Sequence, residues 1–202
     1  MKNTLAGPVP VALTGITRQL GPRDKAALMG HFLRLNSEDR TMRFFSPVGD
    51  ASINAYVEAI NWARTVLIGH FAGARLVGLA EVIPTGPRWQ RCAEVAVSVE
   101  PDWRRHGLGK RLLDRAMAAA RAVGLRQLRL VILPDNHTMV RLARGLGGKM
   151  RSDSGVVTAQ IALWPERKMP AWLEHLAGVL ASAPTQLVET LHWPHRLHRR
   201  AA

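Results

Sequence analysis

The sequence contains little cysteine and few aromatic residues. Its 202 residues include one cysteine, Cys92, and one tyrosine, Tyr56, and aromatic residues make up 5% of the chain. A single cysteine excludes a disulfide within the chain and is typical of a reducing compartment.

Long apolar runs are also absent. No stretch approaches the ~20 apolar residues that a membrane-spanning helix needs. Gly7, Pro8 and Pro10 interrupt the N-terminal segment where a secretory signal has its apolar core. We therefore expect a soluble cytoplasmic protein.

Acidic residues are outnumbered by basic ones, 15 to 28, and the net charge is +13. A basic excess of this size indicates an anionic partner, such as nucleic acid, a phosphorylated ligand, an acidic protein surface or membrane headgroups, or only a solvated basic surface. The arginines are spread along the chain, so the charge does not favour nucleic acid. Near the C-terminus, His192, His195 and His198 have Pro194 among them and no nearby carboxylate or cysteine. We predict no metal site there.

The hydrophobic periodicity predicts alternating helices and strands. The expected helices cover 22–35, 37–45, 51–62, 107–123 and 136–146. The expected strands cover 9–17, 65–71, 75–83, 92–99, 127–133, 149–151 and 156–163. This order predicts a mixed α/β domain over residues 1–165, with a mostly antiparallel sheet flanked by helices. Residues 166–202 are expected to form a helical extension and a basic tail.

A glycine-rich loop follows the strand over 92–99 and precedes a helix. Residues 104–110 have the sequence Arg-Arg-His-Gly-Leu-Gly-Lys. The first turn of a helix presents unpaired N–H groups and a positive dipole end, and glycines let a phosphate approach the backbone. Arg104, Arg105 and Lys110 add positive charge. The loop therefore predicts a phosphate-bearing ligand.

Two common phosphate-binding motifs do not match this loop. A Walker loop needs glycine where Arg104 stands and serine or threonine where Arg111 stands. A dinucleotide fingerprint needs a third glycine where Leu112 stands.

The pattern Arg104-x-x-Gly107-x-Gly109, directly after a valine-rich strand, resembles the acyl-CoA loop of GNAT acetyltransferases. The resemblance covers about residues 76–163 and, more loosely, the N-terminal third. The segments 93–99, 136–147 and 37–45 are similar to the catalytic domain of Pat-type bacterial protein lysine acetyltransferases. The chain would correspond to that domain alone. The resemblance implies the GNAT fold, with the sheet splayed at the acyl-CoA site.

The same resemblance implies acetyl-CoA as the cofactor and a primary amine, of a protein lysine or a small molecule, as the acceptor. It implies that Glu94 is the catalytic base, and Glu81 is the reserve candidate. A glutamate at position 94 is otherwise an ion-paired surface residue, and Asn136 otherwise only caps a helix. The residues expected to contact the cofactor are Val97, Val99, Arg104, Arg105, His106, Gly107, Leu108, Gly109, Lys110 and Asn136.

The general acid is not assigned by the resemblance. Many relatives carry a tyrosine where this chain has Ala143. A thiol with a pKa of ~8.5 makes its thiolate a good leaving group, so solvent can protonate it, or another residue can. We predict an N-acetyltransferase that uses direct attack of the amine on the thioester. The alternative is a non-catalytic acyl-CoA-binding or sensor module. A homodimer is left open.

Overall fold

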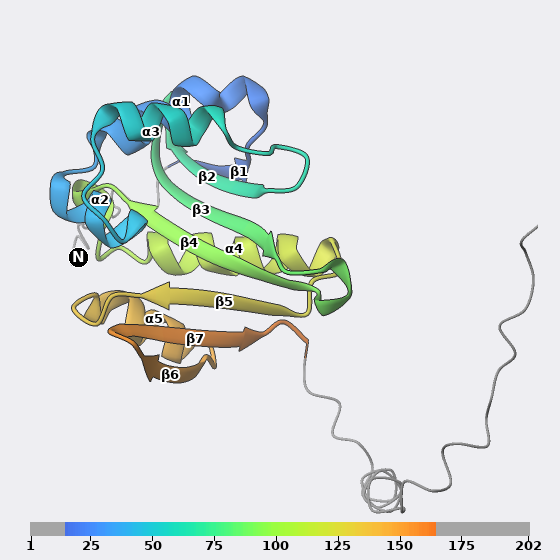
Figure 1. The fold of residues 1–202 in the computed structure, drawn as a ribbon. Coiled ribbons are helices and arrows are strands. Elements are labelled where there is room, and N and C mark those ends of the chain that lie inside the picture. Colours follow the sequence, from blue (N-terminus) through green and yellow to red (C-terminus); the bar gives the residue numbers. More distant parts are fainter. Residues whose placement is uncertain (1–14, 165–202) are drawn as a thin grey trace, which may run out of the picture. The chain divides into compact units, whose positions relative to one another are not determined.

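The computed structural model describes residues 15–164 (Figure 1), which are built around a seven-stranded sheet in the order β1-β2-β3-β4-β5-β7-β6. Every pair of neighbouring strands is antiparallel except β4 and β5, which are parallel. The predicted mixed fold with a mostly antiparallel sheet is therefore confirmed. The strands are β1 (Ile16–Gln19), β2 (Val66–Ala72), β3 (Arg75–Thr85), β4 (Cys92–Val99), β5 (Gln127–Ile132), β6 (Lys149–Asp153) and β7 (Val156–Ala162).

Helices cover both faces of the sheet. Alternate residues of β3 belong to two cores, because Leu79 packs with α1 and α3 while Ala80 packs with α4 on the opposite face. Figure 1 shows α1 and α3 over the β1–β3 part of the sheet and α4 behind it. The helices are α1 (Lys25–Arg34), α2 (Ser37–Phe44), α3 (Asp50–Glu58), α4 (Leu108–Ala122) and α5 (His137–Gly145).

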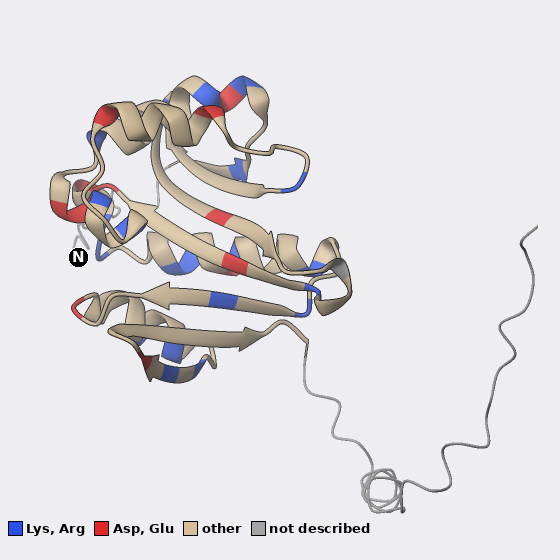
Figure 2. Cartoon of the chain, viewed as in Figure 1, with Lys and Arg blue, Asp and Glu red and all other residues tan. Residues whose placement is uncertain are grey.

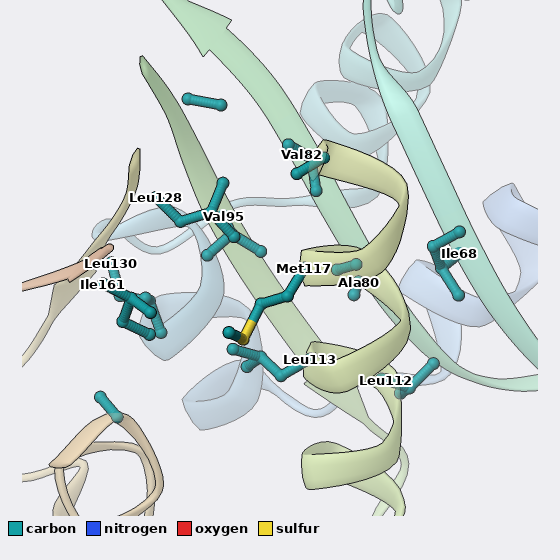
Figure 3. Close-up of a cluster of buried hydrophobic side chains, with 14 of the residues drawn as sticks. Ile68, Ala80, Val82, Val95, Leu112, Leu113, Met117, Leu128, Leu130 and Ile161 are labelled. Atoms are coloured by element: carbon teal, nitrogen blue, oxygen red, sulfur yellow. The ribbon is translucent and has the colours of Figure 1, made fainter. Parts of the chain in front are cut away.

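The apolar stripe of α4 fixes this helix across the sheet. Figure 3 shows its side chains packed against those of the neighbouring strands. Each fully buried leucine contributes roughly 1.5–3 kcal/mol to this packing. The stripe therefore holds the N-terminus of α4 beyond the end of β4. Its buried members are Leu108, Leu112, Leu113, Ala116, Met117 and Ala120.

Several element boundaries differ from the sequence-based expectation, three of them for identifiable reasons. Strand β1 begins at Ile16 rather than near residue 9, and residues 1–14 lie outside the described part of the chain. Helix α3 ends at Glu58, and Asn61 then accepts a hydrogen bond from the Ala63 backbone N–H (3.2 Å) in a turn. Strand β3 continues through Pro84, because its pairing with β2 has already ended at Val82. Proline is tolerated on such an unpaired edge.

Helices of membrane-spanning length and apolarity are not found among residues 15–164. In the same residues, no cluster of three or more His, Cys, Asp or Glu side chains is arranged to hold a metal ion. The expected helical extension, the three C-terminal histidines and the boundary after residue 165 lie outside the described residues.

Candidate active site

The sheet opens between β4 and β5. These strands pair only over Cys92–Glu94 and Gln127–Arg129. Beyond Glu94, β4 keeps its pairing with β3, and beyond Arg129, β5 keeps its pairing with β7. The backbone of β4 that faces β5 therefore has no partner strand after Glu94, which agrees with the splay that the resemblance implied.

A cleft of about 230 Å³ lies along this opening. One wall combines Val95–Val97 of β4 with Leu130–Ile132 of β5 and with Asn136 and Met139 at α5. The remaining lining residues, which we call the α2 wall, are Met42–Phe44 of α2, its C-cap Phe45, Tyr56 of α3 and Ile83 of β3. Glu94 of β4 also lines the cleft.

The loop after β4 leads into α4 through a left-handed residue at Gly107 (φ 81°), the N-cap. The first backbone bond of the helix runs from the Arg111 N–H to the Gly107 carbonyl (3.0 Å). The N–H groups of Leu108, Gly109 and Lys110 are thus in the unpaired first turn. The Leu108 side chain is buried in the core, so only its backbone faces outward.

Gly109 is not required by the packing of the protein itself. A Cβ placed there would meet only Leu142 Cδ2, at an ordinary 3.8 Å, and the backbone at Gly109 is not left-handed. The absent side chain instead leaves room above the first turn of α4. This room fits a phosphate group held by backbone N–H groups.

We expect Gly109→Val to weaken CoA binding by about 10- to 100-fold, because a branched side chain blocks charge-assisted bonds worth about 1.5–3 kcal/mol. Titration calorimetry measures the change. Gly145→Val is the matched control, since a Cβ at Gly145, the last residue of α5, meets nothing within 4 Å. Equal CoA affinity in both variants would contradict the prediction.

The cations of the loop are placed differently from one another. Arg104 donates from Nε to the Val99 carbonyl (2.9 Å) and pairs through Nη2 with Asp39 Oδ1 (2.6 Å). Lys110 pairs with Asp114 (2.8 Å), one turn along α4. Arg105 and His106 are exposed. Arg104 and the Val99 carbonyl, both expected at the cofactor, are therefore bonded to each other.

Glu94 lies at the last rung that joins β4 to β5. Its Oε2 accepts from Nη2 of Arg129, the residue directly opposite on β5 (3.1 Å). The Glu94 side chain is one-third exposed (33%), so it remains accessible from the cleft. Figure 2 shows acidic segments in the middle of β3 and β4 and a basic segment on the adjacent β5. Glu94 therefore forms the ion pair expected of a surface residue and also lines the cleft.

Arg129 was not singled out from the sequence. An arginine inside the strand sequence Gln-Leu-Arg-Leu-Val-Ile is an unusual feature that could have indicated it. Its partner became evident only from the register of β4 and β5, which are 35 residues apart at this rung.

Glu81 is buried behind the α2 wall, at 1% exposure. Its Oε2 accepts from the Tyr56 hydroxyl (2.8 Å) and pairs with Arg43 Nη2, which also donates to Tyr56 (3.2 Å). The Arg43 guanidinium lies over the rings of Phe44 (4.8 Å) and Tyr56 (5.7 Å). These contacts stabilise the wall through charge and cation–π attraction.

Tyr56 lines the cleft but is a weak acid. Burial, together with the Glu81 carboxylate and against the opposing effect of Arg43, raises the pKa of Tyr56 to about 12. An ordinary thiol has a pKa of ~8.5, so transfer of the Tyr56 proton to a thiolate is unfavourable. Tyr56 is therefore suited to donate a hydrogen bond to Glu81 and is poorly suited to act as the general acid that protonates the thiolate.

We expect Tyr56→Phe to keep kcat within about fivefold, while the lost hydrogen bond to buried Glu81 lowers the free energy of unfolding by about 1–3 kcal/mol. Steady-state kinetics and urea unfolding measure the two effects. A fall in kcat above about 100-fold, with CoA affinity unchanged, would instead assign the acid role to Tyr56.

Asn136 is the N-cap of α5. Its Oδ1 accepts from the Met139 N–H (3.1 Å), and the residue also lines the cleft. Ala143, at the position of the tyrosine that many relatives carry, is fully buried. Asn136 therefore caps α5 and also lines the cleft.

A buried polar cluster supports the start of the loop. Glu100 directly follows β4, is 1% exposed, and receives hydrogen bonds from His31 (3.3 Å), Arg34 (2.8 Å) and Arg75. Burial opposes ionisation, but the bonds from His31, Arg75 and Arg34 lower the pKa of Glu100 to about 2. The sequence carried no signal for these contacts, since the three partners lie 25 to 69 residues away.

Ser98, His31 and Glu100 share the residue types of a hydrolase triad. His31 Nε2 lies 2.8 Å from the Ser98 hydroxyl. Burial lowers the pKa of His31, so the ring is neutral and can donate to Glu100 and accept from Ser98. All three side chains are buried and none lines the cleft, so the cluster is structural.

A model of the acetyltransferase (GNAT) family matches residues 33–147. The chain belongs to this family. The match includes all the residues that line the cleft, from Met42 to Met139, and the glycine-rich loop. This membership agrees with the resemblance drawn from residues 104–109.

Solved structures with the same fold include acetyltransferases of known name. The GNAT domain of S. lividans PAT has a TM-score of 0.63 and 20% identity, covering 72% of this chain and 89% of that one. Spermidine N-acetyltransferase from Vibrio cholerae, in complex with CoA and spermine, has a TM-score of 0.59 and 20% identity, covering 73% and 95%. At these identities the likeness shows the fold.

One curated relative is more similar over a short stretch. Mycothiol acetyltransferase of Thermobifida fusca is 60% identical over 47 residues, which are 23% of this chain. The match spans only 13% of the length of that protein. It therefore supports the family and leaves the acceptor open.

Proposed function

We propose that this GNAT protein is an acetyl-CoA-dependent N-acetyltransferase that acts on a primary amine. One observation carries the proposal: Glu94 lines the cleft at the point where β4 and β5 separate. A carboxylate at this point can accept the proton that an ammonium group must lose before it can react.

The residues around the opening fit CoA. Its phosphates match the unpaired N–H groups at the start of α4, where Gly109 leaves room. Its extended arm matches the unpaired backbone of β4, and Val97 is the favoured contact because the Val99 carbonyl already accepts from Arg104. When bound, acetyl-CoA supplies the acetyl group as an activated thioester.

Within this proposal Glu94 is the base and Glu81 is not. Glu94 is accessible and is oriented by Arg129, whereas Glu81 is enclosed by Arg43 and Tyr56. A base must come within hydrogen-bond reach of the proton that it removes. The exposure of Glu94 to the cleft supports its role as the base, whereas the burial of Glu81 does not favour Glu81.

The acceptor that we propose is a primary amine on an apolar stem. Met42, Phe44, Phe45 and Ile83 give the α2 wall an apolar surface. The two carboxylates closest to it, Glu81 and Glu94, are each paired with an arginine. Such a site suits one amine on a methylene chain, as in a protein lysine of the Pat type, better than a polycation. We expect the enzyme to work in a bacterial cytoplasm.

The alternative is a non-catalytic acyl-CoA-binding or sensor module. Ala143 is buried where many relatives carry the acid, and the raised pKa of Tyr56 does not replace it. Solvent at the open cleft must then protonate the thiolate if the chain is a catalyst. Turnover, rather than binding, separates the two functions.

The first test is thermal unfolding with acetyl-CoA, CoA, ATP and NADPH in parallel. A ligand at a hundred times its Kd adds about 2.7 kcal/mol of stability. We expect a shift with acetyl-CoA and CoA alone, followed by acetylation of lysine peptides or small amines. A shift without turnover on any amine would support the sensor. No shift with acetyl-CoA or CoA would overturn the proposal.

A further inference from the structure

Helix α2 contributes residues to the α2 wall of the cleft, yet none of its eight residues is fully buried. Met42–Phe45, at its C-terminal end, line the cleft. The apolar packing of α2 is concentrated at Phe44, which contacts the rings of Phe32 (5.4 Å) and Tyr56 (5.2 Å), so polar contacts hold the rest of the helix. The position of the α2 wall therefore depends on identifiable hydrogen bonds and ion pairs.

One set of these contacts joins α2 to neighbouring segments of the chain. The guanidinium of Arg40 donates to the carbonyls of Leu33 (2.8 Å) and Leu35 (2.9 Å) and pairs with Asp50 (2.7 Å) at the start of α3. At the other end of α2, Arg43 pairs with Glu81 of β3. These bonds connect α2 to α1, α3 and the sheet.

A separate contact joins α2 to the glycine-rich loop after β4 (residues 101–110), which we call the cofactor loop. Asp39 Oδ1 pairs with Arg104 Nη2 (2.6 Å), and Arg104 Nε donates to the carbonyl of Val99 at the end of β4 (2.9 Å). The Asp39 side chain is 14% exposed, and its Oδ2 is buried without a hydrogen-bond partner. The charge of Asp39 is thus largely desolvated and depends on Arg104 for its compensation.

We propose that Asp39 and Arg104 are positioning residues that couple the cofactor loop to the α2 wall. Arg104 then serves as the link between two sites rather than as a phosphate ligand. A CoA phosphate that orders the loop also orders α2 through this pair, and by reciprocity an acceptor that orders α2 favours CoA binding. The inference rests on the proposed function, because it takes CoA as the ligand of the loop.

The test is hydrogen exchange of the full chain with and without CoA, in the wild type, Asp39→Asn, Arg104→Gln and the double variant. In the wild type we expect CoA to slow exchange in residues 101–110 and also in α2. In each variant we expect protection of the loop but not of α2. The double variant should behave like either single one, since both remove the same contact. Calorimetry should show CoA affinity in Asp39→Asn within about threefold of the wild type.

Asp50→Asn is the matched control, because it breaks an ion pair of α2 that does not reach the loop. In this variant α2 should exchange faster overall but still respond to CoA. Protection of α2 by CoA in Asp39→Asn would overturn the coupling, as would its absence in the wild type. A tenfold or greater loss of CoA affinity in Arg104→Gln alone would identify Arg104 as a phosphate ligand instead. Failure of the wild type to bind CoA would overturn the proposed function as well.

Discussion

Replacement of Glu94 by glutamine is expected to lower kcat by about 10²- to 10⁴-fold, the usual contribution of a positioned base. Glutamine keeps the shape of the side chain and can still accept from Arg129, but it cannot take a proton from an ammonium group. The affinity for acetyl-CoA should stay within about twofold, because Glu94 is assigned to the acceptor's proton and not to the cofactor. Steady-state kinetics and calorimetry on the same preparation measure both quantities.

Two further variants make this result specific. Glu58→Gln is the control, since Glu58 is an exposed residue of α3 (63% for its side chain) that pairs with Lys25 and does not line the cleft. It should leave kcat unchanged. Glu81→Gln tests the reserve candidate. Full activity in Glu94→Gln together with a comparable loss in Glu81→Gln would transfer the role of base to Glu81.

Replacement of Glu100 by glutamine is expected to lower the free energy of unfolding near neutral pH by about 3 kcal/mol, the scale for breaking a buried ion pair. The amide leaves Arg34 and Arg75 without a negative partner, and its NH₂ group faces N–H donors where a carboxylate oxygen accepted. Because Glu100 leads into the loop, the variant should also bind CoA more weakly. Urea unfolding and calorimetry measure the two effects.

The pH dependence identifies the carboxylate as the cause. The pKa of Glu100 is depressed to about 2 in the folded protein. The stability that it contributes is therefore complete above its ordinary pKa of about 4.5 and is lost as the pH falls towards about 2. Glu100→Gln should flatten this part of the acid-unfolding profile. An unchanged profile would contradict the assignment.

Local patterns of the sequence were sufficient for most elements of the sheet and for the cofactor loop. The alternation of Val95, Val97 and Val99 with Glu94, Ala96 and Ser98 predicted β4, because it has the period of a strand. The helical spacing of Leu108, Leu112 and Ala116 predicted part of the buried face of α4, whereas Val123, which has the same spacing, is 62% exposed. The glycines at 107 and 109 predicted a helix N-terminus open to an anion, and both stand where a side chain would be strained or would fill the space. Strand β3 was predicted too short, since the tolerance of Pro84 depends on where β2 ends.

The site was predicted in part. The resemblance predicts Glu94 as a site residue, and Glu94 lines the cleft. Its partner Arg129, the enclosure of Glu81 and the three partners of Glu100 were not predicted. Each of these contacts joins residues that are far apart along the chain.

The sequence by itself determined the family, the order of the elements and the loop, because these follow from short-range periodicity and from a motif a few residues long. Only the tertiary structure decided which charges meet. In the structure β4 and β5 separate after three paired residues, and Arg104 pairs with Asp39. Arg43 and Tyr56 both donate to the carboxylate of Glu81. The physical reason is that an ion pair depends on distance in space, and strand register and helix packing set that distance.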